Sequence, residues 1–211
     1  MNKELRFKTA GASLPGDLAL PNSAQGLIVF AHGSGSSRKS PRNRFVAETL
    51  RASGRFGTLL FDLLTPDEDA DYANRFDIAL LAGRLESVTL DVLSQPNLGD
   101  LPLGYFGAST GAAAAIAAAV RLGERIKTVV SRGGRPDLAG PALRELFAPT
   151  LLIVGGLDDV VIGLNQQALA MIPAAAKCLE IVPGATHLFE EPGTLERAAE
   201  LTLGWFERFL V

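Results

Sequence analysis

The sequence has 211 residues, of which 47% are hydrophobic and 20% are charged, and it is therefore long enough to bury a substantial core. The formal net charge is −3, and no basic run is long enough to follow a phosphate backbone, which argues against a nucleic-acid partner. We expect one globular domain over residues 1–211.

The chain begins with two short apolar segments, residues 5–8 and 18–20, on either side of the turn signal Pro15-Gly16-Asp17, which predicts an antiparallel hairpin. In chain order, short apolar, β-branched runs then predict strands at residues 26–30, 58–61, 103–106, 126–130, 150–154 and 178–182. Segments with helical spacing predict helices at residues 42–53, 72–94, 110–122, 141–147, 165–171 and 194–210. This alternation is typical of an α/β fold with a mostly parallel central sheet between two layers of helices. Only about 19 residues separate the strands at 126–130 and 150–154, so we expect no large lid domain and an open active site.

Membrane and secretory signals are not evident in the sequence. The first ten residues carry four charged side chains and lack the continuous apolar region of a signal peptide. The most apolar stretch, residues 111–120, is about half as long as a bilayer-spanning helix and is expected to be a buried helix. Cys178 is the single cysteine and cannot form an internal disulfide. We expect a cytoplasmic protein with no membrane partner.

The strongest motif is Gly107-Ala108-Ser109-Thr110-Gly111, which follows a predicted strand and precedes an alanine-rich predicted helix. So sharp a turn from strand to helix holds the central serine in a strained backbone conformation, and glycines two positions away on either side avoid collisions. The N-terminus of the following helix is aimed at Ser109, where it stabilises a developing negative charge. The motif therefore predicts a nucleophilic serine, the alternative being a turn that needs glycine for packing only.

A serine hydroxyl is a weak nucleophile that needs an adjacent base, and the chain has only two histidines. His187 follows the last predicted strand and is our candidate base, whereas we expect a structural role for His32. The base needs a carboxylate that fixes its tautomer, and Asp158 and Asp159 lie on a loop between Ser109 and His187 in the chain. We predict Asp158 as this carboxylate, with Asp159 as the alternative.

Hydrolysis by a serine also needs two donors for the oxyanion of the tetrahedral intermediate. The backbone N–H of Thr110, directly after the serine, is predicted as one donor. The other is predicted to be the backbone N–H of Ser34, because His32-Gly33-Ser34 resembles the His-Gly oxyanion loop of many esterases. Under this interpretation His32 shapes the loop through hydrogen bonds.

Taken together, these residues resemble the α/β-hydrolase superfamily and, within it, a small group similar to dienelactone hydrolases. The likeness runs from about residue 26 to the C-terminal helix and includes the chain order serine, aspartate, histidine. It implies an α/β-hydrolase fold with Ser109, Asp158 and His187 as its triad. Dienelactone hydrolases use cysteine as the nucleophile, so their lactone substrate is not carried over to this chain. Residues 32–43 also resemble hydrolase domains that occur alone or fused to phosphoribosyltransferases.

Substrate preference is suggested by four arginines on loops at the expected carboxyl ends of strands, where ligands of α/β proteins bind. They are Arg38, Arg42, Arg132 and Arg135. If they converge on Ser109, they favour a small ester with an anionic acyl group or a phosphate, because arginine binds both groups bidentately. The alternative is that they face water or pair with nearby acids, namely Asp62, Asp67 or Glu68.

We therefore expect a serine hydrolase that cleaves a small ester through an acyl-enzyme, in the manner of a carboxylesterase. A serine acyltransferase or a thioesterase would use the same triad and stays open as an alternative. A non-catalytic binding module is less favoured because no triad member is missing.

A nucleotide-binding protein is disfavoured because Arg38 stands where the third glycine of a dinucleotide fingerprint belongs and no Walker lysine motif is present. The two histidines and one cysteine are spread along the chain, so we expect no metal site and no cofactor. The sequence does not indicate which oligomeric state the protein has.

Overall fold

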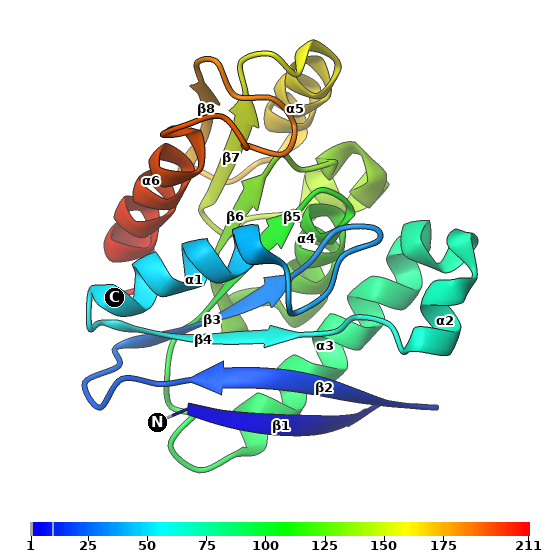
Figure 1. Ribbon diagram of the computed structural model, residues 1–211, viewed down its shortest axis with the longest axis vertical. Coiled ribbons are helices and arrows are strands. Elements are labelled where there is room, and N and C mark those ends of the chain that lie inside the picture. Colours follow the sequence, from blue (N-terminus) through cyan, green and yellow to red (C-terminus); the bar gives the residue numbers. More distant parts are fainter. Residues whose placement is uncertain (1, 10) are drawn as a thin grey trace.

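The computed structural model describes residues 2–9 and 11–211, and its centre is a twisted sheet of eight strands (Figure 1). The strands are β1 (Asn2–Thr9), β2 (Ala12–Ala19), β3 (Gly26–Ala31), β4 (Phe56–Phe61), β5 (Leu103–Ala108), β6 (Ile126–Arg132), β7 (Thr150–Gly155) and β8 (Lys177–Val182). Their order in the sheet is β1-β2-β4-β3-β5-β6-β7-β8. Strands β3 to β8 are mutually parallel, and β2 joins β4 in antiparallel pairing. The mostly parallel sheet predicted from the sequence is confirmed.

Helices form a layer on each face of this sheet (Figure 1). One layer contains α1 (Pro41–Ala52) and α6 (Thr194–Phe209), and the other contains α3 (Ile78–Ser94), α4 (Thr110–Leu122) and α5 (Asp159–Met171). Shorter helical segments are α2 (Pro66–Ala70) and three 3₁₀ segments, η1 (Tyr72–Phe76), η2 (Gly123–Arg125) and η3 (Pro136–Glu145). Each layer closes its own apolar cluster against the sheet, so the central strands are covered on both faces.

The composition of the central elements explains their burial. Every residue of β3, β4, β5 and β7 is buried, as expected for parallel strands that are covered on both faces and read as continuous apolar runs. Helix α4 is also buried around most of its circumference, because its alanines leave little side-chain bulk between its backbone and the sheet. This close packing fixes the position of the α4 N-terminus at the end of β5.

The N-terminal hairpin exists, but its predicted turn is wrong. The chain reverses between Thr9 and Ala12, where Gly11 has a φ of +77°, and Pro15-Gly16-Asp17 lies inside β2. Gly16 is needed there for packing, since an added Cβ would lie 2.7 Å from Phe7 and 3.1 Å from Phe61. Pairing of β2 with both neighbours therefore overrides the local turn propensity of these three residues.

Three predicted helices also differ from the structure. The segment 72–94 is divided into η1 and α3 by Asp77, whose carboxylate caps α3 by accepting the N–H of Leu80 at 3.0 Å. Residues 141–145 of the predicted helix at 141–147 belong instead to η3, which is kinked at Gly140 with a φ of +54°. Helix α5 begins at Asp159, well before the predicted residue 165. The Asp77 cap and the positive φ of Gly140 decide the first two of these boundaries.

The connection between β6 and β7 has a direct bearing on access to the sheet. It consists mainly of η3, which packs on α4 and α5. No lid domain covers the carboxyl ends of the strands in the described part of the chain. Among the described helices, none combines the length and apolar character that a membrane span requires.

Candidate active site

The loops that follow β3, β5, β6 and β8 meet at the carboxyl edge of the sheet and enclose a pocket of about 200 Å³. Its lining includes Ser34, Ser109, Arg132 and His187, each from a different one of these loops or strand ends. Three larger hollows, of about 490, 500 and 250 Å³, lie elsewhere on the surface, and none of their described linings includes Ser109 or His187. The candidate site is therefore the smaller pocket.

Ser109 has the strained backbone expected of an exposed nucleophile. Its φ is +51° and its ψ is −124°, a conformation rarely taken by a residue with a side chain. An added Cβ at Gly107 would lie 2.5 Å from Ala112 Cα, and one at Gly111 would lie 2.2 Å from the carbonyl oxygen of Ala31. Both contacts are with backbone atoms, which leave no room for a side chain. The two glycines therefore permit the sharp passage from β5 into α4.

Backbone contacts also fix the surroundings of Ser109. Its N–H donates to the carbonyl of Arg132 at 3.3 Å, and its carbonyl accepts the N–H of Arg135 at 3.1 Å. Helix α4 begins at Thr110, so the positive end of the helix lies beside the serine. An added Cβ at Gly33 would lie 2.8 Å from Ser109 Cβ. The structure thus brings the loop that carries Ser34 against the serine, next to Thr110.

His187 and Asp158 form a direct hydrogen bond, with 2.7 Å between Nδ1 and Oδ2. A carboxylate only accepts, so Nδ1 carries the proton and donates it, which leaves the lone pair of the imidazole on Nε2. Asp158 occupies the N-cap position of α5, yet its side chain makes no capping hydrogen bond. Asp159, by contrast, is the first residue of α5 and is exposed. Of the two candidate aspartates, Asp158 is the one that contacts the histidine.

The His187 loop and the Asp158 loop are held together through their backbones. The N–H groups of Gly156 and Leu157 donate to the carbonyls of Val182 at 2.8 Å and Ala185 at 2.9 Å. An added Cβ at Gly155 would lie 2.4 Å from the carbonyl oxygen of Ala185, so the two loops pack without an intervening side chain. Their close fit places the carboxylate within reach of the imidazole.

The hydroxyl of Ser109 and the imidazole of His187 open onto the same pocket. Among the hydrogen bonds of the described residues, none joins these two groups directly. Such bonds are often long in free enzymes and tighten when substrate is bound. The side chain of His187 is 39% exposed, which leaves it room to approach the serine.

His32 is placed behind the pocket as a buried, neutral side chain. Its Nε2 accepts the N–H of Leu63 at 3.0 Å, so Nδ1 carries the proton and donates to the carbonyl of Gly33, also at 3.0 Å. Burial lowers the pKa of His32 below its usual value of 6.5. These two bonds tie the loop after β3 to the chain after β4, in agreement with the structural role expected for His32.

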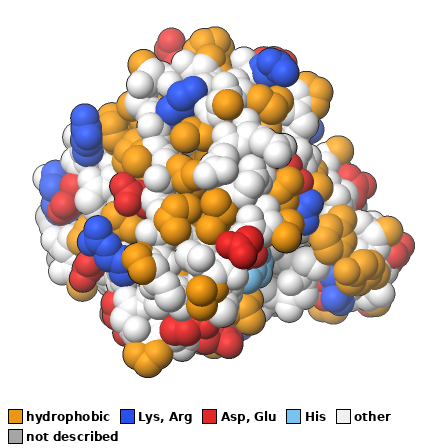
Figure 2. Space-filling model, turned by 90° about the horizontal axis from the view of Figure 1, so that it is seen from above, with side chains coloured by type: hydrophobic (Ala, Val, Ile, Leu, Met, Phe, Trp, Pro, Cys, Tyr) orange, Lys and Arg blue, Asp and Glu red, His pale blue; other side chains and the backbone are white. Residues whose placement is uncertain are grey.

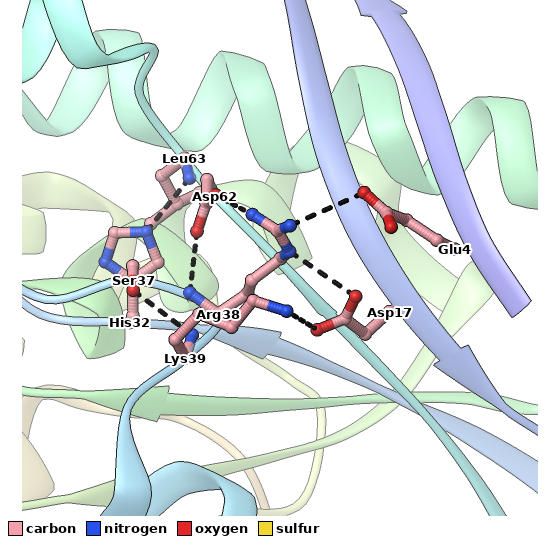
Figure 3. Close-up of polar contacts among 8 residues, drawn as sticks. All are labelled: Glu4, Asp17, His32, Ser37, Arg38, Lys39, Asp62 and Leu63. Atoms are coloured by element: carbon pink, nitrogen blue, oxygen red, sulfur yellow. Dashed lines mark hydrogen bonds and ion pairs between the residues drawn. The ribbon is translucent and has the colours of Figure 1, made fainter. Parts of the chain in front are cut away.

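Arg38 belongs to a charged cluster beside this loop and does not line the pocket (Figure 3). Its backbone N–H and its Nη1 both donate to the carboxylate of Asp62, each at 2.6 Å. The same guanidinium contacts Asp17 at 3.4 Å and Glu4 at 3.5 Å. Figure 3 shows the guanidinium turned toward these carboxylates. Carboxylates of the protein pair with this side chain, and its contact with substrate stays a prediction.

The other three arginines are also separated by the structure. Arg135 donates two hydrogen bonds to Asp137, at 2.9 and 2.8 Å, and is not part of the pocket lining, so its contact with substrate also stays a prediction. Arg42 lines the pocket and pairs with Glu190 at 2.9 Å. Arg132 lines the pocket and is buried, with 7% of its surface exposed.

Two residues near the site were not predicted from the sequence. Asn43, which is 2% exposed, accepts a hydrogen bond from Arg132 Nη2 at 3.3 Å. Phe189, whose φ is +56°, places its ring 5.5 Å from the centre of the Arg132 guanidinium. Asn43 ends the segment 32–43 and Phe189 lies two residues after His187, but only the fold brings both to the end of β6.

Apolar side chains accompany the polar groups of the site. Leu188, next to the candidate base, lines the pocket and is 41% exposed, and Leu157, next to Asp158, is 64% exposed. Figure 2, which looks at the molecule from above, shows hydrophobic side chains gathered on this face and a histidine at the surface beside acidic side chains. Such a surface offers contacts to an apolar part of a small ligand.

Comparison with curated proteins identifies two relatives, although no model of a known protein family matches the chain. Both relatives come from strains of Mycobacterium tuberculosis and are 57% identical over 206 residues, or 97% of this chain. Their provisional names call them phosphoribosyl transferases. The chain spans only 46% of each relative, so the match concerns about half of those proteins.

Solved structures show the family. A dienelactone hydrolase from Anabaena variabilis superimposes with a TM-score of 0.95 at 48% identity, over 100% of this chain and 99% of that one. The fold is shared with Est1E from Butyrivibrio proteoclasticus bound to ferulic acid, at a TM-score of 0.82, 16% identity and 97% and 98% coverage. It is also shared with an esterase domain from Rhodothermus marinus, at 0.78, 18% identity and full coverage of both chains. The identity of 48% over the full length shows that this chain belongs to the α/β-hydrolase superfamily, among its dienelactone hydrolase-like members.

Proposed function

We propose that this chain is a serine hydrolase that cleaves a small ester or thioester, in the manner of a carboxylesterase. In this proposal Ser109 is the nucleophile, His187 is the general base and Asp158 orients and stabilises the imidazole. The observation that supports it most is the 2.7 Å hydrogen bond from His187 to Asp158, at a pocket that also contains a serine with a φ of +51°.

The first half of the reaction follows from the tautomer of His187. The lone pair on Nε2 takes the proton of the Ser109 hydroxyl while Oγ attacks the carbonyl carbon of the ester. The carbonyl π electrons move to oxygen, and a tetrahedral intermediate forms. Its collapse breaks the bond to the leaving alcohol or thiol, which receives the proton from Nε2, and an acyl-serine remains.

The second half returns the enzyme to its starting state. A water molecule gives a proton to Nε2 of His187 and attacks the acyl carbon. A second tetrahedral intermediate then breaks its bond to Ser109, whose Oγ takes the proton back, and the carboxylic acid leaves. In both halves Asp158 stabilises the imidazolium by its negative charge without accepting the proton itself.

The oxyanion of both intermediates needs donors that are already in place. We propose the backbone N–H groups of Thr110 and Ser34 for this role. Thr110 begins α4, so its N–H has no partner within the helix, and Ser34 lines the pocket next to Gly33, whose backbone lies against Ser109. The N-terminus of α4 adds a favourable electrostatic contribution.

The curated relatives bear on this proposal through their length. Their names refer to phosphoribosyl transfer, and each is more than twice as long as the segment shared with this chain. We propose that the shared half is a hydrolase unit, in line with the resemblance of residues 32–43 to hydrolase domains fused to phosphoribosyltransferases. An acyltransferase or thioesterase would use the same residues, and the acceptor of the acyl group separates these activities.

The test is covalent labelling with a fluorophosphonate probe, which phosphonylates activated serines. We expect one labelled peptide containing Ser109, with labelling abolished in Ser109→Ala and kept in Ser37→Ala, which changes a half-buried serine of the loop after β3 that is outside the pocket lining. A panel of short-chain esters and thioesters, assayed with and without an added alcohol as acyl acceptor, then distinguishes hydrolase, thioesterase and acyltransferase. A folded wild-type protein that neither takes up the probe nor cleaves any ester would be a binding module, and the proposal would be wrong.

A further inference from the structure

The pocket beside Ser109 has a charge opposite to that of the whole chain. Arg42 and Arg132 are its charged lining residues apart from His187, and the described lining contains no aspartate or glutamate. The chain as a whole has a net charge of −3. Ser34, Ser36 and Ser40 also line this pocket. A small cavity lined by two arginines and several serines has the chemistry of an anion-binding site.

Arg132 is the more unusual of the two cations. Its side chain is 7% exposed, and no carboxylate in the described part of the chain lies within 4.0 Å of it. Nη2 donates to Asn43, whereas Nε and Nη1 have no hydrogen-bond partner in the protein. A buried charge without a counter-charge is costly and is normally paired. The guanidinium is therefore held in position by Asn43 and by the ring of Phe189, and no carboxylate of the described residues pairs with it.

Burial and the nearby positive charge of Arg42 lower the pKa of Arg132 to about 10. The guanidinium still carries its charge at neutral pH. The lowered pKa and the unpartnered nitrogens agree that no carboxylate of the described residues pairs with Arg132.

Arg42 lies near the mouth of the same pocket, in the first turn of α1. It pairs with Glu190, whose side chain is 62% exposed, and such an exposed pair contributes little and exchanges readily with another anion. The first turn of α1 contains no acidic residue, and Ser40 and Asn43 of that turn also line the pocket. The positive end of the helix dipole therefore adds to the two arginines.

We propose that this pocket binds an anionic group of the substrate, a carboxylate or a phosphate, close to the bond that Ser109 attacks. Arg132 is the specificity-determining residue, and Arg42 is a second cation at the rim of the pocket. The inference rests on the proposed hydrolase function, because it names the substrate class of that site. The volume of about 200 Å³ limits the anion-bearing part to a short chain. A monoester of a short dicarboxylic acid fits this description, and so does a small ester that carries a phosphate.

Binding can be measured without turnover in Ser109→Ala. Titration calorimetry with succinate and, separately, with inorganic phosphate identifies which anion the site prefers. We expect at least one to bind, with affinity reduced about 10- to 100-fold by Arg132→Gln, as loss of a charge-assisted hydrogen bond predicts. Arg42→Gln should reduce it less. Arg44→Gln, which removes an arginine of α1 outside the pocket, should leave it unchanged.

Turnover provides the second arm. We expect the wild type to prefer monomethyl succinate over methyl butyrate in kcat/KM, and Arg132→Gln to lower that ratio by about tenfold or more, with partial recovery in Arg132→Lys. If Arg132→Gln fails to fold, the effect of Arg42→Gln and the wild-type preference for monomethyl succinate over methyl butyrate still test whether the pocket binds an anionic group.

The outcomes separate the two proposals. Hydrolysis of neutral esters with labelling of Ser109, but no anion binding and no preference for the charged ester, would overturn the anion site and leave the hydrolase standing. Anion binding that depends on Arg132, without any reactivity of Ser109, would support the anion site and overturn the hydrolase.

Discussion

Replacement of Asp158 by asparagine should remove most of the activity, whereas the same change at Asp159 should not. Asparagine keeps the shape of the side chain but removes its charge, and Asp158 is the residue that contacts His187, at 2.7 Å. Asp159 is exposed in the first turn of α5 and has no contact with the imidazole among the described hydrogen bonds.

The geometry sets the size of the effect. A nitrogen–oxygen distance of 2.7 Å places the centres of the imidazolium and carboxylate charges roughly 4 Å apart, which corresponds to about 4 kcal/mol at an effective dielectric constant of about 20. The side chain of His187 is 39% exposed, so solvent screening reduces this to roughly 2 kcal/mol as a lower bound. Between these limits, kcat for Asp158→Asn should fall by about 30- to 1000-fold. Loss of the correct tautomer would enlarge the deficit.

The assay is hydrolysis of p-nitrophenyl acetate by wild type, Asp158→Asn and Asp159→Asn, with thermal unfolding to show that all three are folded. We expect Asp159→Asn to stay within about twofold of wild type, as for a surface charge remote from the chemistry. Equal losses in the two variants, or a loss under about threefold in Asp158→Asn, would refute the assignment of the carboxylate.

Three further predictions concern the loop after β3. In Gly33→Ala the added methyl group would lie 2.8 Å from Ser109 Cβ, so the loop must move away from the serine. We expect kcat/KM for p-nitrophenyl acetate to fall by about 100-fold, as for a displacement of about 1 Å. An unchanged kcat/KM would contradict a close fit of this loop to the serine. His32 stays neutral in the folded protein because burial lowers its pKa below 6.5, whereas the unfolded chain takes up a proton below that pH. The contribution of His32 to the free energy of unfolding should therefore be complete above about pH 6.5. Below that pH it should decrease by up to about 1.4 kcal/mol per pH unit. Urea unfolding at pH 7.5 and 5.5 should show a smaller loss in His32→Gln than in wild type, and equal losses would exclude His32 as the source. Asp62→Asn removes the charge that pairs with Arg38 at 2.6 Å, where both side chains are less than 20% exposed. This change should lower the free energy of unfolding by about 3 kcal/mol. A change under about 0.5 kcal/mol would indicate that solvent already screens this ion pair.

The sequence predicted the parts of the site that depend on chain order and local geometry. A serine between two glycines at a strand-to-helix turn has few conformations open to it, and the positive φ of Ser109 is the one that the motif requires. Loops that follow parallel strands come out at the same edge of the sheet, so a histidine and an aspartate that follow β8 and β7 are brought to the same edge. The contact between His187 and Asp158 follows from this topology.

Features that depend on contacts between distant segments could not be predicted. Pro15-Gly16-Asp17 has the composition of a turn, but pairing with both neighbouring strands places it inside β2. The four arginines look alike in sequence, yet Arg38 and Arg135 are held by carboxylates of the protein and Arg132 is not. The difference is made by which side chains the fold places around each guanidinium.

The proposed function requires that Ser109, His187 and the oxyanion donors act on one carbonyl group. A crystal structure of the protein after reaction with a phosphonate inhibitor tests it most directly. We expect the phosphorus atom on Ser109 Oγ, the phosphonyl oxygen about 3 Å from the backbone nitrogens of Thr110 and Ser34, and Nε2 of His187 within hydrogen-bond distance of Oγ. An adduct on another serine, or an adduct on Ser109 with the imidazole turned away from it and bonded elsewhere, would contradict the account.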